Sequence, residues 1–282
     1  MESAGTAHRC RSISWQAASQ GYAALLGAGI GLLLSSVLSQ PDLESWGWRI
    51  PFILGLLIGP VGWYIRRCLP ETHSVSEVAA TKTGSWRERI DLRTTLLAIG
   101  LMASGTIGMY LFVFYMPAYL VTSMHYPPRS AMAIGCVTSA CLALITPIAA
   151  RFADRHVLRK KLLVWTVSLP VVMAWPAFWL LNQSPDLYIA MLVVTLLILP
   201  ACVGAGAFFA LIMEAFAKPN RVLGTAVSYS FGVTLFGGFS PLIATWLTTA
   251  LNDPLAPALY LLAGGVLSLT CLKLFPENPG RE

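Results

Sequence analysis

Residues 46–72 read WGWRIPFILGLLIGPVGWYIRRCLPET, and this stretch decides the fold of the chain. Two tryptophans and one arginine stand near its start, and the pair Arg66 and Arg67 follows its apolar part. No charged residue occurs between Ile50 and Ile65, and with the tryptophan flanks the apolar part reaches the roughly 20 residues that a helix needs to cross a bilayer. The stretch therefore predicts a membrane-spanning helix with an aromatic anchor at one end and a basic anchor at the other.

The end of this stretch has an echo later in the chain. LPET at 69–72 is matched by FPEN at 275–278, which again follows an apolar segment with a basic end. Pro276 lies 206 residues after Pro70, and we interpret this interval as one structural repeat of six helices. Because only two helices precede Pro70, we expect the chain to be the later two-thirds of a twelve-helix protein, with four helices upstream of residue 1.

The composition places the whole chain in the membrane. With 56% hydrophobic residues, 11% charged residues and a mean hydropathy of +0.67, the chain is too apolar for a soluble domain of its length. Apolar runs long enough to span a bilayer fall at eight places. They are 16–39, 47–68, 94–122, 130–151, 161–181, 186–213, 222–250 and 256–275. The sequence therefore predicts an all-α protein with eight transmembrane helices.

The basic residues predict how these helices are oriented. When successive connections alternate between the two sides, 17 of the 19 Lys and Arg residues fall on one side, and only Arg49 and Arg129 fall on the other. Since basic residues are enriched in cytoplasmic loops, we expect a multi-pass protein of the plasma (inner) membrane with both termini in the cytoplasm. The net charge of +6 thus reflects topology, and it indicates no nucleic-acid partner.

The polar residues divide the chain into three parts. Residues 1–69 are expected to hold the last two helices of a first bundle, 70–93 a cytoplasmic linker, and 94–282 a six-helix second bundle. Three helices carry small residues at every fourth position, which lets helix backbones approach closely in lipid. Both general close packing and a sliding interface between bundles explain these positions, which are Ala23, Gly27, Gly31 and Ser35; Gly100, Ser104 and Gly108; and Gly224, Ser228 and Gly232.

Several separated motifs together carry a family resemblance. They are SWQ at 14–16 with SQ at 19–20, WGWRIPF, RRCLPET, YMPAYL at 115–120, SYSFGVTLFGGFSP at 228–241 and APALYLL at 256–262. In this order they resemble the metabolite:proton symporters of the major facilitator superfamily, a group that includes citrate, 2-oxoglutarate, shikimate and proline/betaine carriers. The resemblance implies that the eight helices are helices five to twelve of a twelve-helix, two-bundle carrier.

The superfamily's loop signature, G-x-x-x-D-R-x-G-R-R or K, has a partial match at 150–161. The resemblance implies that Asp154 and Arg155 form a conformational latch, because an aspartate can accept hydrogen bonds from the exposed amides of a helix N-terminus. Both glycines are replaced, by Ala150 and Val157, which makes a tight turn costlier. A solvated loop acid at Asp154 therefore remains the alternative.

Charged residues are almost missing from the apolar runs. Ionisable groups inside a membrane are usually functional, so we expect the proton-coupling residues to lie on helices outside this chain. The borderline acid is Glu214, at the end of an apolar run. It is a candidate gate or proton site, and a plain ion pair with the nearby cation Arg221 is the competing interpretation.

Uncharged polar residues are the remaining candidates for a substrate cavity. For Gln16 and Gln20 a role in a gate or in helix packing is equally plausible, and for the tyrosines a role in aromatic packing is the alternative to substrate binding. The candidates are Gln16, Gln20, Tyr110, Tyr115, Ser228, Tyr229 and Thr234.

These observations predict a proton-coupled symporter of a small metabolite that works by alternating access. We expect an organic acid such as citrate or a dicarboxylate as substrate, with a zwitterionic osmolyte such as proline or betaine as the alternative. A non-transporting remnant, or a fragment that needs a partner for the missing helices, is a further alternative. No pattern for an enzyme, a metal site or a cofactor is found, and the expected partners are the lipid bilayer, the substrate and protons. The oligomeric state is left open.

Overall fold

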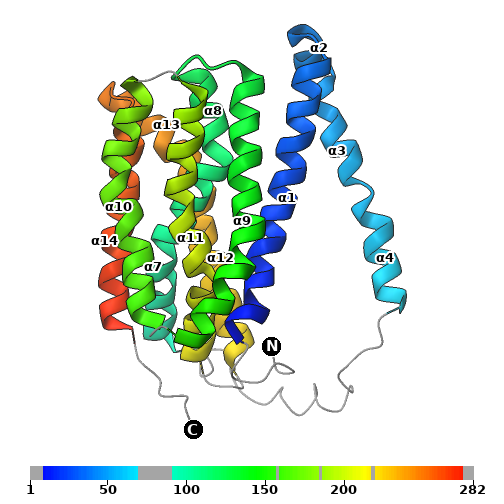
Figure 1. Cartoon of the computed structure of the whole chain (residues 1–282). Coiled ribbons are helices and arrows are strands. Elements are labelled where there is room, and N and C mark those ends of the chain that lie inside the picture. Colours follow the sequence, from blue (N-terminus) through cyan, green and yellow to red (C-terminus); the bar gives the residue numbers. More distant parts are fainter. Residues whose placement is uncertain (1–8, 69–90, 157–158, 184–185, 217–219, 276–282) are drawn as a thin grey trace.

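The computed structural model describes residues 9–68, 91–156, 159–183, 186–216 and 220–275, with side chains except at 9–13 and 152–159. Within these ranges the chain is helical and contains no strand (Figure 1). The first two spans hold α1 (Arg9–Val37), α2 (Gln40–Ser45), η2 (Gly47–Arg49), α3 (Ile50–Gly55) and α4 (Ile58–Cys68). The others hold α7 (Leu92–Met109), η3 (Tyr110–Tyr115), α8 (Met116–Thr122), α9 (Pro128–His156), α10 (Arg159–Gln183), α11 (Leu187–Ala215), α12 (Arg221–Gly232), η5 (Val233–Gly238), α13 (Ser240–Leu251) and α14 (Ala256–Leu274).

The described part contains 8 segments that are long and apolar enough to cross a membrane, so the prediction of an all-α protein with eight spans is confirmed. The second span differs from the expected continuous helix, because it is broken between α3 and α4. Pro60 has no N–H, and in a regular helix its ring would crowd the carbonyl of Leu56, four residues earlier, which favours a break at this point. The predicted linker lies outside the described residues up to position 90, and residues 92–93 already belong to α7.

Six spans, from α7 to α14, form one bundle, and α1 lies against it (Figure 1). The most extensive contact of α1 is with α9, which runs antiparallel to it: Gly21 faces Ala143, and Gly31 faces Met132. The approach is closest at Gly21, where a Cβ atom would lie 2.5 Å from the backbone nitrogen of Ala143. The small residue at 21 therefore lets the two backbones touch, although it is not one of the predicted small positions.

The predicted small positions on α7 and α12 lie inside the bundle. At α7, the Ser268 hydroxyl of α14 accepts a hydrogen bond from the Ser104 amide at 2.8 Å and donates to the Leu101 carbonyl at 3.0 Å. On α12, Gly224 lies against Phe216 and Gly232 against Met102. For these two helices the small residues therefore serve close packing between helices of the same bundle.

Two spans of the bundle contain a π-helix near their middle, η3 in one and η5 in the other. Each π-helix is followed by a helix that has proline as its second residue, Pro117 in α8 and Pro241 in α13. A proline cannot donate to the carbonyl four residues earlier and collides with it, which widens the preceding turn. The segment η5 lies against α7, and Gly237 of η5 packs against Thr106 of α7 and against Tyr110, the first residue of η3.

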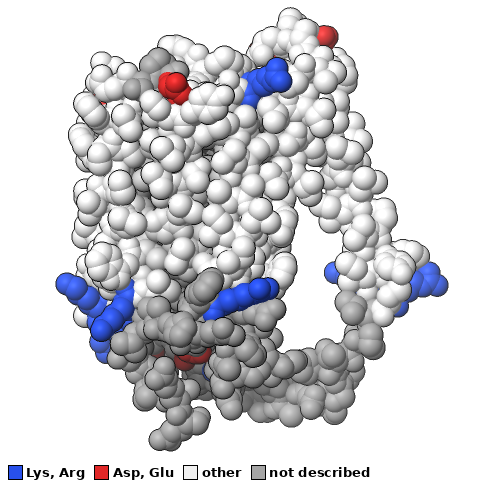
Figure 2. All heavy atoms as spheres, viewed as in Figure 1, with Lys and Arg blue, Asp and Glu red and all other residues white. Residues whose placement is uncertain are grey.

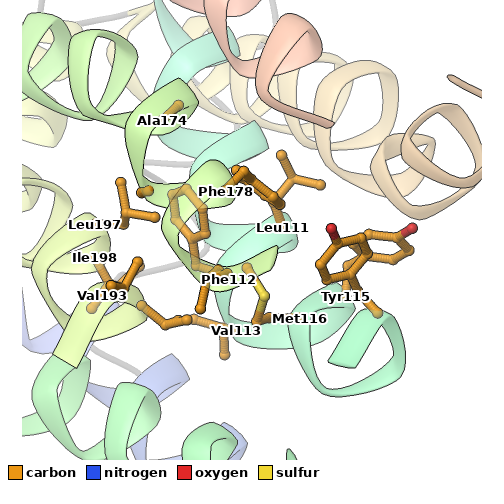
Figure 3. Packing of buried hydrophobic residues seen from close by; sticks show 14 of the residues in the cluster. Leu111, Phe112, Val113, Tyr115, Met116, Ala174, Phe178, Val193, Leu197 and Ile198 are labelled. Atoms are coloured by element: carbon orange, nitrogen blue, oxygen red, sulfur yellow. The ribbon is translucent and has the colours of Figure 1, made fainter. Parts of the chain in front are cut away.

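The larger part of the buried core surrounds η3. Leu111 and Phe112 of η3 pack beside Phe178 of α10 and beside Leu197 and Ile198 of α11 (Figure 3). The ring of Phe178 also meets Tyr119 edge-on, with centroids 5.6 Å apart. The irregular segment of the α7 span is thereby fixed by packing on both neighbouring helices.

The second span stands apart from the rest. Gly47 at its start is buried, but the residues from Phe52 to Cys68 are all exposed, and Figure 2 shows open space between this span and the other helices. Its ends carry cation–π contacts, from Arg49 to Trp48 at 5.2 Å and from Arg67 to Trp63 at 5.1 Å. The described Lys and Arg side chains gather mainly at the end of the molecule where α1 begins and α14 ends, which we call the basic end.

The contact between α1 and α9 gives a first prediction. The change Gly21→Ala should lower the free energy of unfolding by about 1–3 kcal/mol, because the added methyl group meets the backbone of α9, which cannot move aside as a flexible side chain could. Gly29→Ala on the same helix is the control, since a Cβ there meets nothing within 4 Å. Thermal unfolding in detergent micelles measures both variants, and equal stability of the two would contradict the assigned contact.

A second prediction concerns the start of α7, outside the membrane-spanning segment. The Asp91 carboxylate caps this helix by accepting hydrogen bonds from the Arg93 amide, at 3.1 Å, and from the Thr94 hydroxyl. The hydrogen bond from Thr94 is the main cause that lowers the pKa of Asp91 below its usual value. A lowered pKa stabilises the fold at pH values above the ordinary aspartate pKa of about 4, and this contribution disappears as the pH falls through the lowered pKa.

We therefore expect Asp91→Ala to cost about 0.5–2 kcal/mol at pH 7, the usual cost of losing such a cap, and clearly less at pH 3. Asp91→Asn keeps a hydrogen-bond acceptor without a titrating charge, so its stability difference from the alanine variant should hardly change with pH. Unfolding midpoints at the two pH values measure this, and an alanine penalty that is the same at pH 3 and pH 7 would argue against the charged cap.

Candidate substrate cavity

A cavity of about 690 Å³ lies between α1 and the six-helix bundle. The wall on α1 is made of small side chains and one polar one, because Ala and Gly recur every three or four residues on the face of α1 that it meets. These lining residues are Ala17, Gln20, Ala23, Ala24, Gly27 and Ala28. At Gly27 a Cβ atom would meet nothing within 4 Å, so the backbone of α1 itself forms part of the wall.

The opposite walls carry aromatic rings and methionines. Phe209 of α11 touches Phe208 edge-on, with centroids 5.4 Å apart, and its ring lies 5.9 Å from that of Tyr229 of α12. Tyr110 and Phe114 of η3 form a second ring pair, at 5.2 Å. Thioethers add soft, polarisable surface. They belong to Met102, Met109 and Met132.

Among the described residues, those that line this cavity include no Asp, Glu, Lys, Arg or His. Its polar side chains are few, and some of them are engaged: the Thr166 hydroxyl donates to the Leu163 carbonyl at 3.3 Å, and the Gln20 amide donates to the Tyr229 hydroxyl at 3.0 Å. A charge that entered such a cavity without a partner would lose its hydration at high cost. The lining provided by this chain therefore suits uncharged or soft cationic groups better than several carboxylates.

The predicted cavity residues separate into two groups. Gln20, Tyr110 and Tyr229 line the cavity, whereas Gln16, Tyr115, Ser228 and Thr234 do not. Gln16 and Thr234 are exposed on other faces of their helices. Tyr115 is buried and its hydroxyl accepts from Thr245 at 3.4 Å, while Ser228 is buried on the same side of α12 as Gly224 and Gly232.

Sequence reasoning missed the residues that give the cavity its shape. Phe208 and Phe209 looked like ordinary apolar residues of a membrane helix, and the alanines of α1 looked like packing positions. The one feature of the sequence that could have indicated a cavity is the run of small residues on α1. Small side chains leave space beside a helix wherever the neighbouring helices do not fill that space. Only the placement of α1 against the bundle distinguishes a packed glycine such as Gly21 from a wall residue such as Gly27.

The latch and gate candidates lie away from this lining. Asp154 and Arg155 fall in the last turn of α9, where side chains are outside the described part of the structure. Glu214 is half-buried near the end of α11, and Arg221 is the first residue of α12, so both lie at the basic end. The Arg221 Nε atom is buried without a hydrogen-bond partner among the described residues. Within the described ranges no three His, Cys, Asp or Glu side chains are grouped to hold a metal ion.

Comparison with known proteins shows which family the chain resembles. Residues 1–229 match the family model of the Major Facilitator Superfamily. A citrate-proton symporter of Klebsiella pneumoniae is 27% identical over 269 residues, which cover 92% of this chain and 59% of the relative. A proline/betaine transporter of Escherichia coli K12 is 28% identical over 273 residues, 91% of this chain and 54% of the relative. A putative proline/betaine transporter of Staphylococcus aureus is 31% identical, over 83% of this chain and 51% of the relative.

The chain thus spans between half and three-fifths of the length of these relatives, and no solved structure matches it. The relatives are named as transporters, which agrees with a multi-pass membrane protein that encloses a solute-sized cavity. The resemblance to proton symporters of metabolites is confirmed by these matches. With its eight membrane spans and a family match over most of its length, the chain belongs to the Major Facilitator Superfamily.

Proposed function

We propose that this chain forms part of the solute pathway of a proton-coupled secondary carrier, in which α1 and the six-helix bundle move relative to one another to expose the cavity alternately on the two sides. The observation that carries the proposal is the cavity between α1 and the bundle, in a chain whose relatives include a citrate-proton symporter. The asymmetry of the basic residues supports a bacterial inner membrane location, with the basic end and both termini in the cytoplasm.

The substrate is proposed from the chemistry of the lining. An organic acid such as citrate was the expected class, and it would require cations that the described lining does not supply. A methylated ammonium group is different, because it has no hydrogen-bond donors to lose and is attracted to aromatic faces. The rings of Tyr110, Phe209 and Tyr229, together with the relatives named as proline/betaine transporters, favour a betaine-like zwitterion, which carries one carboxylate where citrate carries three, as substrate of this cavity.

A second candidate is a fragment that transports only with further helices supplied by another polypeptide. The second span, which is exposed from Phe52 to Cys68, favours it, as does the shortage of ionisable groups in the described cavity lining. Co-expression with the first four helices of a related carrier tests this candidate. Uptake that requires co-expression would support it, and uptake by the chain alone would exclude it.

The transport prediction is tested by uptake of labelled glycine betaine, proline and citrate into vesicles that contain the chain, with an inward proton gradient. We expect accumulation of glycine betaine that a protonophore abolishes, with little citrate uptake. Gly27→Leu should lower the initial rate of uptake about tenfold or more, because the leucine side chain would occupy the cavity. Moving it aside to admit the solute would cost about 1–3 kcal/mol.

The matched control is Gly29→Leu on the same helix, where a Cβ also meets nothing within 4 Å but the residue lies outside the cavity lining. Its uptake rate should stay close to that of the unchanged protein. Equal inhibition by both variants would show that the cavity is not the pathway. Accumulation of citrate in preference to glycine betaine would overturn the proposed substrate class and leave transport itself intact.

A further inference from the structure

One hydrogen bond crosses from α1 to α12. The side-chain amide of Gln20 donates to the hydroxyl of Tyr229 at 3.0 Å, and the two residues are 209 positions apart in the chain. Helix α1 packs on α9 and α11, whereas its backbone hardly approaches that of α12. The bond is therefore made by two long side chains that reach toward each other beside the cavity they both line.

Packing alone does not require these two polar groups. The ring of Tyr229 already lies against Phe209, with centroids 5.9 Å apart, and a phenylalanine would keep that contact. Gln20 sits in an apolar membrane helix where a leucine would be less costly, and polar side chains in such positions usually have a role. Both groups occupy a lining with few other polar side chains, so each is the natural partner of the other.

The bond lies on the side of the cavity that faces the basic end. Gln20 is six residues into the span that begins at Ser14, which is about 9 Å along the helix. Tyr229 is eight residues beyond Arg221, or about 12 Å. The lining of α1 continues past Gln20 as far as Ala28, toward the other end of the membrane. The lining of α1 begins at Ala17, on the basic-end side of Gln20, so the bond crosses between α1 and α12 within the cavity. The part of the cavity beyond the bond, with Gly27 and Ala28, lies toward the other end of the membrane.

The neighbouring contact of α1 is of a different kind. At Gly21 the backbones of α1 and α9 touch, and such close packing does not give way gradually. A single hydrogen bond between two neutral groups, by contrast, contributes little net free energy and can break when the helices rotate. A movement of α1 relative to α12 would therefore break the bond between Gln20 and Tyr229 more readily than it would separate the backbones at Gly21.

We propose that the hydrogen bond between Gln20 and Tyr229 is a breakable tie between α1 and α12 that restricts access from the basic end to the part of the cavity beyond Gln20, where Gly27 lies. The tie goes beyond the proposed transport function, since it concerns how the cavity is closed and does not depend on the solute. Opening toward the basic end requires this bond to break, and closing restores it.

The test measures access to the cavity directly. A cysteine is placed at Gly27, where a side chain has space, in protein whose six native cysteines are replaced by alanine. A membrane-impermeant maleimide is then applied from either side of sealed vesicles. Tyr229→Phe and Gln20→Leu should each raise the labelling rate from the basic end on the order of three- to tenfold, the change expected from losing one neutral hydrogen bond. The double variant should label no faster than either single one.

Tyr115→Phe is the matched control. It also removes a tyrosine hydroxyl that accepts a hydrogen bond, from Thr245 at 3.4 Å, but both partners belong to the bundle and Tyr115 does not line the cavity. Figure 3 shows Tyr115 at the edge of the core cluster around η3. Its labelling rate should match that of the unchanged protein. The proposal would be overturned if Tyr115→Phe raised the labelling rate as much as Tyr229→Phe does, or if Tyr229→Phe had no effect on it. Additive effects on the labelling rate in the double variant would also overturn it.

A second measurement covers the case in which the cysteine-free protein does not fold. Hydrogen–deuterium exchange on protein with its native cysteines should become faster in residues 14–20 of α1 after Tyr229→Phe, and should not change there after Tyr115→Phe. Unchanged exchange in both variants would also overturn the proposal. Neither measurement needs a transported solute, so a failure of the tie and a failure of the proposed transport function give different results.

Discussion

The cavity depends on one contact, the touching of two helix backbones where Gly21 of α1 meets Ala143 of α9. In lipid no hydrophobic force drives helices together, so close packing of small residues must hold them. This contact brings the face of α1 that carries Gln20 and Gly27 opposite the rings of α11 and α12. If α1 were one side chain further away, the cavity would lose its wall and the hydrogen bond from Gln20 to Tyr229 could not form. A position without any chemistry of its own thus determines the geometry of the candidate site.

The eight spans could be predicted from the sequence, because a bilayer requires every backbone group to be satisfied within a helix and about 20 apolar residues to cover it. The irregularities were harder to predict. Pro117 and Pro241 are visible in the sequence, but nine prolines lie within the predicted spans, and among the described residues only these two follow a π-helix. Pro147 and Pro170 lie inside continuous helices, so the outcome depends on how neighbouring helices pack around each turn.

Of the candidate site, the sequence pointed to Gln20, Tyr110 and Tyr229, since uncharged polar groups in apolar helices stand out. It could not separate them from Tyr115 and Thr234, because helical spacing alone does not say which face meets a cavity and which meets lipid. The π-helix makes this worse, since the extra residue in each wide turn rotates the following side chains away from their expected positions. Tyr110 lines the cavity, whereas Tyr115, five residues later, packs against Tyr119.

The exposed second span and the uncharged cavity bear differently on whether this chain can transport alone. An apolar helix surrounded by lipid loses no hydrophobic free energy, and the contacts of Arg49 with Trp48 and of Arg67 with Trp63 can anchor both ends of the span at the membrane surfaces. Its exposure is therefore physically tolerable. The cavity poses the stronger constraint, because coupling to protons needs a group that binds a proton at accessible pH, and the lining from this chain offers none. The proposed proton coupling therefore requires an ionisable group outside this lining, and Glu214, near the end of α11, is the acid that this helix carries.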